Sequence, residues 1–261
     1  MAKTKLLSVI VPAYKQEKTI GRDLTNIVQT LETGLPADFG FEIICVVDGV
    51  LDDTQGEALK TKSPRVKVFA YQENQGKGFA VRFGMSKAVG DYISFLDAGR
   101  DINARGVMML MAHMDWYHAD IIVGSKRHPA SIVSNYPFIR KIYTVGYHLG
   151  VRVLFGLPIK DTQSGIKIFK RKVVEVILPR LLVKRHAMDI EMLAVAWHLG
   201  FRRIYEGPIE VKFDKSVSSI GFKFFGANSA SKMLWDTLAV FYRLHILHYY
   251  DDVNKDNWLH T

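Results

Sequence analysis

Short apolar runs alternate with segments of helical periodicity through the first half of the chain. Runs rich in β-branched residues recur roughly every 25 residues, at 6–11, 41–47, 66–70, 92–96 and 120–123. Between them, apolar residues follow helical spacing over 20–31 and 79–88. Strands that alternate with helices in this way build βαβ units. The pattern therefore predicts an α/β fold with a mostly parallel sheet flanked by helices.

Polar residues stand where several of these predicted strands end. Pro12 and Tyr14 follow the first strand, Asp48 ends the second, and Asp97 ends the fourth. In open parallel sheets, ligands bind beyond the carboxyl ends of the strands. A carboxylate in the position of Asp48 can accept hydrogen bonds from a ribose hydroxyl or a base edge. We therefore expect a ligand site at this edge of the sheet.

The second half of the chain has a different pattern. Helices are predicted over 137–155, 189–199 and 228–249, and strands over 165–169, 202–205 and 209–213, with Gly207-Pro208 separating the last two strands. The last helix is apolar on more than one face, so we expect it to pack into the core. Docking on a partner and insertion into a bilayer interface are the alternatives. We expect one domain over 1–225, with halves 1–125 and 126–225, followed by a helix and tail at 226–261.

Composition narrows the class of protein. With 48% hydrophobic and 23% charged residues, the chain is neither disordered nor fibrous. The single cysteine, Cys45, lies in an apolar run, which predicts a core residue and a reducing compartment. The basic start and the apolar run at 6–11 lead into Pro12 without a small-residue cleavage site, so we expect a strand there and not a signal peptide.

The positive charge is local. Thirteen of the 35 Lys and Arg residues lie at 126–185 with only two of the 26 acids, so this segment carries +11 and the remainder −2. Such a segment suits phosphates, nucleic acid or an anionic membrane surface, and a solvated basic face is the alternative. Because the segment contains no recognisable reading module, we do not expect nucleic acid as a partner.

Two further groups of residues carry candidate chemistry. The stretch 75–78 reads Gln-Gly-Lys-Gly and is followed by Arg82. Its glycines allow close backbone approach and its cations suit a diphosphate, although a turn that caps a helix would look the same. Asp97 and Asp101 provide the oxygen ligands that Mg²⁺ or Mn²⁺ prefers. The alternative is a turn in which Asp101 pairs with a neighbouring arginine.

Five motifs occur in one order along the chain. They are Val9-Ile10-Val11-Pro12-Ala13-Tyr14, Val47-Asp48-Gly49 with Asp53-Thr54, Asn74-Gln75-Gly76-Lys77-Gly78 through Arg82-Phe83-Gly84-Met85, Asp161-Thr162-Gln163-Ser164-Gly165-Ile166-Lys167, and Asp189-Ile190-Glu191. Together, over residues 6 to about 213, they resemble family-2 glycosyltransferases with a Rossmann-like GT-A fold, specifically the dolichyl/polyprenyl-phosphate hexosyltransferase group. The chain departs from the family's Asp-x-Asp at Gly99, so only Asp97 of that pair is carried over.

The resemblance implies inverting, metal-dependent transfer of a hexose from a nucleotide-diphospho-sugar of the UDP-glucose or GDP-mannose type. The donor-binding residues that it implies are Pro12, Tyr14, Asp48, Asp53, Lys77, Arg82 and Ala98. Lys77 and Arg82 would line the donor side or stabilise their loop. Asp97, with Asp101 in place of the missing ligand, would hold Mg²⁺ or Mn²⁺ as cofactor.

The implied acceptor is a polyprenyl or dolichyl phosphate, which is already ionised and needs cations more than a general base. The acceptor-phosphate residues expected are Lys126, Arg127, Arg140, Gln163, Ser164 and Lys167, and the catalytic residues are Asp97, Asp189 and Arg127. The chain would then work peripherally on the cytoplasmic face of a membrane, and a small membrane subunit is a candidate partner.

Two other functions stay open. A saccharide hydroxyl acceptor would require a carboxylate base, for which Asp189 or Glu191 is the candidate, unless Asp189 only caps its helix. A nucleotide-sugar-binding protein without catalysis would also agree with Gly99 in the metal motif.

Overall fold

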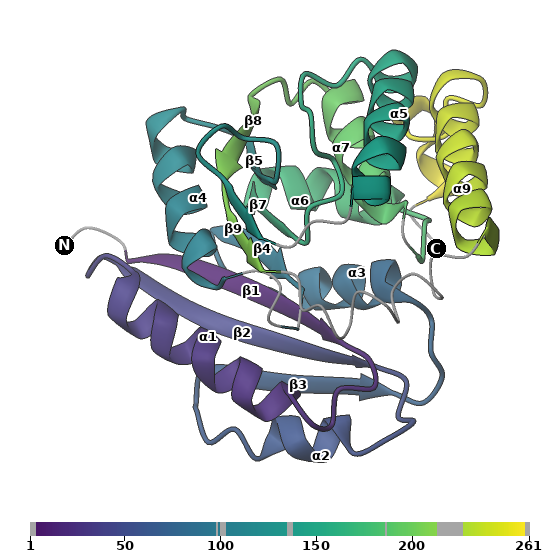
Figure 1. Ribbon diagram of the computed structural model, residues 1–261. Coiled ribbons are helices and arrows are strands. Elements are labelled where there is room, and N and C mark those ends of the chain that lie inside the picture. The colour runs from purple at the N-terminus through teal and green to yellow at the C-terminus, as the bar shows by residue number, and fades with distance from the viewer. Residues whose placement is uncertain are drawn as a thin grey trace.

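A seven-stranded sheet forms the centre of the molecule. The computed structural model describes residues 4–97, 99, 103–134, 138–185, 187–212 and 227–258 (Figure 1). The strands are β1 (Lys5–Ala13), β2 (Phe39–Asp48), β3 (Val66–Tyr71), β4 (Tyr92–Leu96), β5 (Ile121–Ser125), β6 (Ile132–Ser134), β7 (Ile166–Lys170), β8 (Ile204–Pro208) and β9 (Glu210–Lys212). The main sheet has the order β3-β2-β1-β4-β7-β5-β8, and β6 pairs with β9 separately.

The main sheet is mostly parallel, as the sequence pattern predicts. Strands β1 to β4 run parallel to one another, and β5 runs parallel to β8. Strand β7 is antiparallel to both of its neighbours, β4 and β5. Since β7 reverses direction between two strands that point the same way, its first residues lie at the carboxyl ends of β4 and β5.

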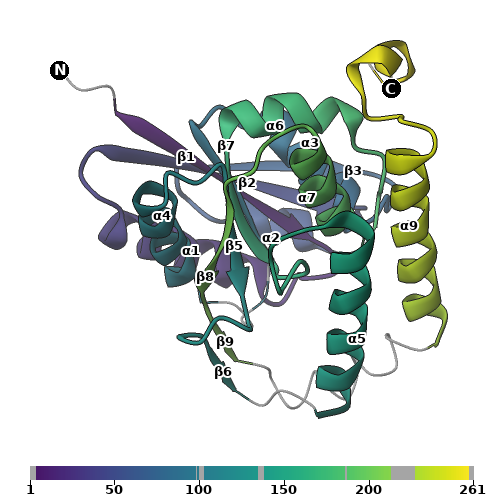
Figure 2. The ribbon, with the colours of Figure 1, turned by 90° about the horizontal axis from the view of Figure 1, so that it is seen from above.

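Helices cover both faces of this sheet (Figure 2). They are α1 (Ile20–Gly34), α2 (Thr54–Leu59), α3 (Lys77–Lys87), α4 (Arg105–Trp116), α5 (Phe138–Phe155), α6 (Arg171–Ile177), α7 (Met188–His198) and α9 (Ala227–His245), with 3₁₀ turns η1 (Leu178–Arg180) and η2 (Asp252–Asn257). The hydrophobic core therefore has two parts, one on each face of the sheet. Val9 of β1 packs among residues of α1 and α4, and Ile10 packs among residues of α3, α6 and α7. Two-sided burial explains why strands such as β2 read as continuous apolar runs.

The end of the sheet differs from the prediction at Gly207-Pro208. This pair does not separate two strands but belongs to β8, where Gly207 and Pro208 pair with Gly124 and Ser125. Proline has no N–H to donate, and it is tolerated here because β8 is the edge strand. The chain then leaves the main sheet, and β9 pairs with the short strand β6, which the sequence pattern does not predict.

The last helix packs against the core along one side only. Val240 and Leu244 are buried, whereas Leu234 and Trp235 are exposed. Helix α9 ends at His245, earlier than predicted, and the chain folds back so that Tyr250 and Trp258 are buried. The division of the chain at residue 225 stays a prediction. Among the described helices, none is long and apolar enough to cross a membrane.

Candidate active site

The residues predicted from strand ends do converge at one edge of the sheet. Pro12 lies near the end of β1, and exposed Tyr14 follows it. Asp48 ends β2, and Asp97 follows β4, where its backbone N–H donates to the carbonyl of Gly165 at 2.9 Å. The three parallel strands explain these four positions, and the reversed strand β7 brings in the loop before Ile166.

Asp48 organises the turn at residues 74–76, which we call the glycine turn. Its buried carboxylate accepts hydrogen bonds from the Asn74 amide (2.8 Å), from the backbone N–H of Gln75 (2.8 Å) and Gly76 (3.0 Å), and from the Tyr71 hydroxyl (2.8 Å). Both carboxylate oxygens are therefore engaged by protein groups. The contact of Asp48 with a nucleoside stays a prediction, and its observed partners show that it fixes the 74–76 turn.

The turn leads directly into Lys77, which reaches the candidate metal ligand. The Lys77 ammonium lies 2.6 Å from Oδ1 of Asp97 and donates to Oδ2 at 2.8 Å. Burial lowers the pKa of Lys77, but the negative charges of Asp97 and Asp189 outweigh it and leave the pKa raised. Lys77 is thus a cation at neutral pH. Arg82, one turn further along α3, donates to the carbonyl of Leu181 and stabilises the neighbouring loop.

The fit of a divalent cation rests on Asp97. Its Oδ1 is buried and accepts no well-aligned hydrogen bond from the described residues. The Lys77 ammonium lies 2.6 Å from it, so this oxygen becomes a cation ligand only when Lys77 turns away. In the part of the chain that the structure describes, no three His, Cys, Asp or Glu side chains gather into a metal site. The predicted residues Ala98 and Asp101 lie outside the described residues. Asp97 is therefore the described residue that would hold a divalent cation.

Asp161 holds the predicted acceptor loop together. Its buried carboxylate accepts from the backbone N–H of Lys126 at 3.0 Å and lies 2.9 Å from the Lys126 ammonium. Burial raises the pKa of Asp161, but Lys126 outweighs that effect and the pKa is lowered. Because Lys126 is paired with Asp161, half-buried Arg127 is the freer cation at the end of β5. The side chain of Arg140, in α5, lies outside the described part of that helix.

Several polar atoms near Asp161 are buried without a hydrogen-bond partner among the described residues. They are the hydroxyl oxygens of Thr162 and Ser164 and both ring nitrogens of His148. The His148 ring lies 3.9 Å from Asp161, and burial lowers the pKa of His148 to about 4. The hydroxyl of Ser164, a predicted phosphate contact, is fully buried, so its contact with a ligand stays a prediction. Gln163, also predicted, donates from its amide to the sulfur of Met233 at 3.0 Å.

Lys167 and Asp189 form a buried pair. The Lys167 ammonium lies 2.5 Å from Oδ1 of Asp189 and donates to the carbonyl of Ser164 at 2.7 Å. Asp189 is not the helix cap that the sequence left open, because α7 begins at Met188 and Asp189 lies inside its first turn. Lys167 is fully buried, so in this structure its ammonium meets protein groups, and its contact with an acceptor phosphate stays a prediction.

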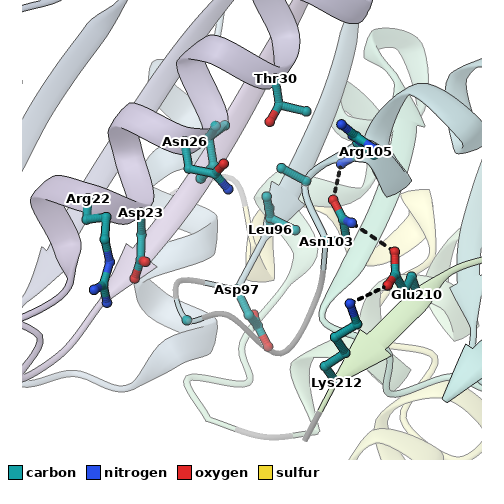
Figure 3. A pocket seen from close by; sticks show the side chains of 13 residues that line it. Arg22, Asp23, Asn26, Thr30, Leu96, Asp97, Asn103, Arg105, Glu210 and Lys212 are labelled. Atoms are coloured by element: carbon teal, nitrogen blue, oxygen red, sulfur yellow. Dashed lines mark hydrogen bonds and ion pairs between the residues drawn. The ribbon is translucent and has the colours of Figure 1, made fainter. Parts of the chain in front are cut away.

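A cavity of about 470 Å³ opens beside Asp97, between α1, the start of α4 and β9 (Figure 3). A hydrogen bond and an ion pair, both to Glu210, lie along its edge. The Asn103 amide donates to Glu210 at 2.9 Å, and the Lys212 ammonium lies 3.0 Å from the same carboxylate. Asp23, from the first turn of α1, is buried at its rim, and burial raises the pKa of its carboxyl. The sequence pattern does not indicate these cavity-lining residues, because the segments that contain them are distant along the chain.

Asp53, Tyr71 and His148 differ in how clearly the sequence indicates them. Asp53 is exposed at the start of α2, and neighbouring Asp52 accepts from the N–H of Thr54 at 3.1 Å. Tyr71 was missed, although its place at the end of β3 was a usable signal. His148 was missed because a lone histidine in an apolar helix gives no signal.

Comparison with known proteins agrees with this geometry. The model of glycosyl transferase family 2 matches residues 8–178. Dolichyl-phosphate β-glucosyltransferase of Drosophila melanogaster is 35% identical over 206 residues, which cover 74% of this chain and 63% of that protein. Its counterpart from Dictyostelium discoideum is 32% identical over 207 residues, with the same coverage. The chain thus matches over less than two thirds of the length of these relatives.

Solved structures show the same fold at low sequence identity. Mannosyl-3-phosphoglycerate synthase from Rubrobacter xylanophilus superposes with a TM-score of 0.68 and 15% identity, covering 92% of this chain and 74% of that one. Glucosyl-3-phosphoglycerate synthase from Mycobacterium tuberculosis, solved with Mn²⁺, UDP and phosphoglyceric acid, gives a TM-score of 0.61 and 17% identity, covering 91% and 78%. Both are GT-A glycosyltransferases, which confirms the predicted fold. With the motif order, the sheet and the family match in agreement, the chain belongs to glycosyl transferase family 2.

Proposed function

We propose that this chain transfers a hexose, with inversion, from a nucleotide-diphospho-sugar to a polyprenyl or dolichyl phosphate. The observation that carries the proposal is the meeting of two parts at one sheet edge. The Lys77–Asp97 pair lies at the end of β4, and the loop that Asp161 fixes to Lys126 lies beside it. The names of the relatives, dolichyl-phosphate β-glucosyltransferases, favour glucose as the hexose.

The donor would bind over the ends of β1, β2 and β4. The 74–76 turn, fixed by Asp48, presents Lys77 at the place where the diphosphate would lie. Asp97 would hold Mg²⁺ or Mn²⁺, which neutralises charge on the leaving diphosphate when it is bound. Lys77 contributes positive charge to the same region, since it can turn from Asp97 to a phosphate oxygen. The Mn²⁺ and UDP in a structural neighbour support this arrangement.

The acceptor phosphate would lie on the side of β5 and β7. One of its oxygens forms a bond to C1 of the hexose as the bond from C1 to the diphosphate oxygen breaks, and the nucleoside diphosphate leaves with the electron pair. Arg127 and the hydroxyl of Ser164 would hold the phosphate against repulsion from the donor. A phosphate nucleophile needs no strong base, which agrees with the pairing of Asp189 to Lys167. A hydroxyl acceptor would need Asp189 free.

A lipid acceptor requires access to a membrane, and we propose attachment on the cytoplasmic face. Helices α5 and α9 lie side by side (Figures 1 and 2), and both present apolar residues to solvent. These are Leu149 and Val153 on α5, and Leu234, Trp235, Leu238 and Tyr242 on α9. Such a face suits the boundary between headgroups and acyl chains. A small membrane subunit is the second candidate for the same face.

The test is a transfer assay with purified protein. UDP-glucose or GDP-mannose, polyprenyl phosphate in detergent and Mg²⁺ or Mn²⁺ are mixed, and the organic phase is analysed by mass spectrometry. We expect a lipid-phospho-hexose that is lost with EDTA and with Asp97→Asn. Transfer to a saccharide hydroxyl, abolished by Asp189→Asn, would replace the lipid acceptor. Donor binding with no product on any acceptor would leave a nucleotide-sugar-binding protein.

A further inference from the structure

Glu191 is a fully buried carboxylate, and its hydrogen-bond partners among the described residues include none from the proposed reaction. It accepts hydrogen bonds from the backbone N–H of Val183 at 2.8 Å and of Leu182 at 3.0 Å. The hydroxyl of Tyr250 donates to it at 2.8 Å, and Arg243 donates at 3.4 Å. Burial raises the pKa of Glu191, and the four donors act against that rise. Two of these donors come from the C-terminal segment at 227–258.

The C-terminal segment is itself firmly docked. Arg180 donates to the carbonyl of Tyr250 at 2.9 Å, pairs with Asp252 and stacks over the Trp258 ring at 3.8 Å. The Tyr250 side chain has no exposed surface. The Tyr250 hydroxyl is thus held in place by its surroundings and presented to Glu191. This segment follows the end of the family match at residue 178.

The loop that Glu191 holds presses against the glycine turn. The carbonyl of Lys184 accepts the backbone N–H of Phe79, in the first turn of α3, at 3.1 Å. A Cβ on Gly76 would lie 2.6 Å from that same carbonyl, and a Cβ on Gly78 would lie 2.7 Å from the carbonyl of Val183. Distances below 3 Å leave no room for a side chain, so turn and loop are in direct backbone contact. Lys77 lies between these two glycines.

We infer that Tyr250 and Glu191 are positioning residues for the donor site, because they hold the 181–184 loop as a wedge that places the Lys77 ammonium on the diphosphate side of Asp97. The contacts form one continuous path from Tyr250 to Glu191, to the N–H groups of the loop, to the glycine turn. The C-terminal segment would thereby complete the donor site without touching the donor. This inference rests on the proposed donor site.

The experiment compares two C-terminal variants in the full chain. Tyr250→Phe removes only the hydroxyl that bonds Glu191. Asp251→Asn weakens the neighbouring contact with His198, which tethers the same segment but does not reach Glu191. Calorimetry measures the Kd of UDP without acceptor, steady-state transfer gives the donor KM and kcat, and thermal unfolding gives the midpoint. Tyr250→Phe should raise Kd and donor KM by roughly three- to tenfold, the value of one buried hydrogen bond, with kcat changed less.

Asp251→Asn should lower the unfolding midpoint, with an unchanged Kd for UDP. Equal Kd values for wild type and Tyr250→Phe would overturn the inference, as would an equal rise in Kd in both variants. Glu191→Gln removes the negative charge and places an amide NH₂ against the backbone N–H groups of the loop. It should therefore weaken UDP binding more than Tyr250→Phe does. If the wild type binds no nucleotide, the proposed function fails instead, and the two failures are distinguished at the first titration.

Discussion

At the scale of single residues, Lys77 and a divalent cation compete for Asp97. The Lys77 ammonium is 2.6 Å from the carboxylate, so a cation binding without a diphosphate must displace it. Lys77→Met should therefore bind free Mn²⁺ roughly two- to fivefold more tightly than wild type, the value of one displaced, partly exposed ion pair of about 0.5–1 kcal/mol. Electron paramagnetic resonance of Mn²⁺ without nucleotide measures this. Lys67→Met, which removes a cation paired with Glu42, is the control. Unchanged Mn²⁺ affinity in Lys77→Met would exclude the competition.

The buried ring of His148 makes stability depend on pH. Its pKa in the folded state is about 4 against 6.5 for an ordinary histidine, because burial outweighs the attraction of Asp161. Between these values the unfolded chain binds more protons, so stability falls as the pH falls from 6.5 to 4. Wild type should lose about 2 kcal/mol from this residue between pH 7 and pH 5.

Urea unfolding at the two pH values measures this loss. His148→Phe fills the buried space without a titrating group, so its stability should change less by about that amount. Parallel pH profiles of the two proteins would show that another group is responsible.

At the scale of elements, the close packing of α3 against the sheet depends on Gly84. A Cβ at this position would lie 2.5 Å from Cγ2 of Ile10, inside the core. Gly84→Ala should lower the free energy of unfolding by about 1–3 kcal/mol, because overpacking moves α3 or its neighbours. Gly150→Ala is the matched control, since Gly150 lies in helix α5 and a Cβ there would meet no described atom within 4 Å apart from its chain neighbours and the backbone of its own helix. The Gly150→Ala substitution should raise the free energy of unfolding by about 0.5–1 kcal/mol. Urea unfolding measures both free energies of unfolding. An unchanged free energy of unfolding in Gly84→Ala would contradict the proposed tight packing of α3 on the sheet.

Elements whose pattern is local could be predicted from the sequence, and those that depend on distant partners could not. Strand β4 is found at the predicted residues, 92–96, because an apolar run flanked by polar residues suffices to define it. The three residues of β6 become a strand only because β9 leaves the main sheet beside them. The site shows the same division. Strand ends indicated Asp48 and Asp97, whereas the pairing of Lys167 with Asp189 depends on the fold that brings the first turn of α7 to the start of β7.

At the scale of the whole molecule, charge and exposed apolar surface together predict how the protein meets a bilayer. The segment 126–185 carries +11, and α9 exposes 71% of Trp235 and 39% of Leu238. Attraction between basic residues and anionic lipids adds to burial of apolar side chains, and salt screens only the first contribution. Binding to vesicles of anionic phospholipid should therefore weaken, but not vanish, as salt rises from 0.05 to 0.5 M, roughly a threefold fall in screening length.

The variant Trp235→Ser with Leu238→Ser separates the two contributions. Both side chains are on the exposed side of α9, so the fold should be preserved, while vesicle binding at high salt should fall at least tenfold. Co-sedimentation with vesicles measures the binding, and the Kd of UDP controls for the integrity of the donor site. Lys62→Ser with Lys87→Ser, which changes two lysines outside the basic segment, provides the matched surface control. If the α9 variant binds vesicles as wild type does at every salt concentration, the apolar face of α5 and α9 is not the membrane contact, and a protein partner becomes its favoured occupant.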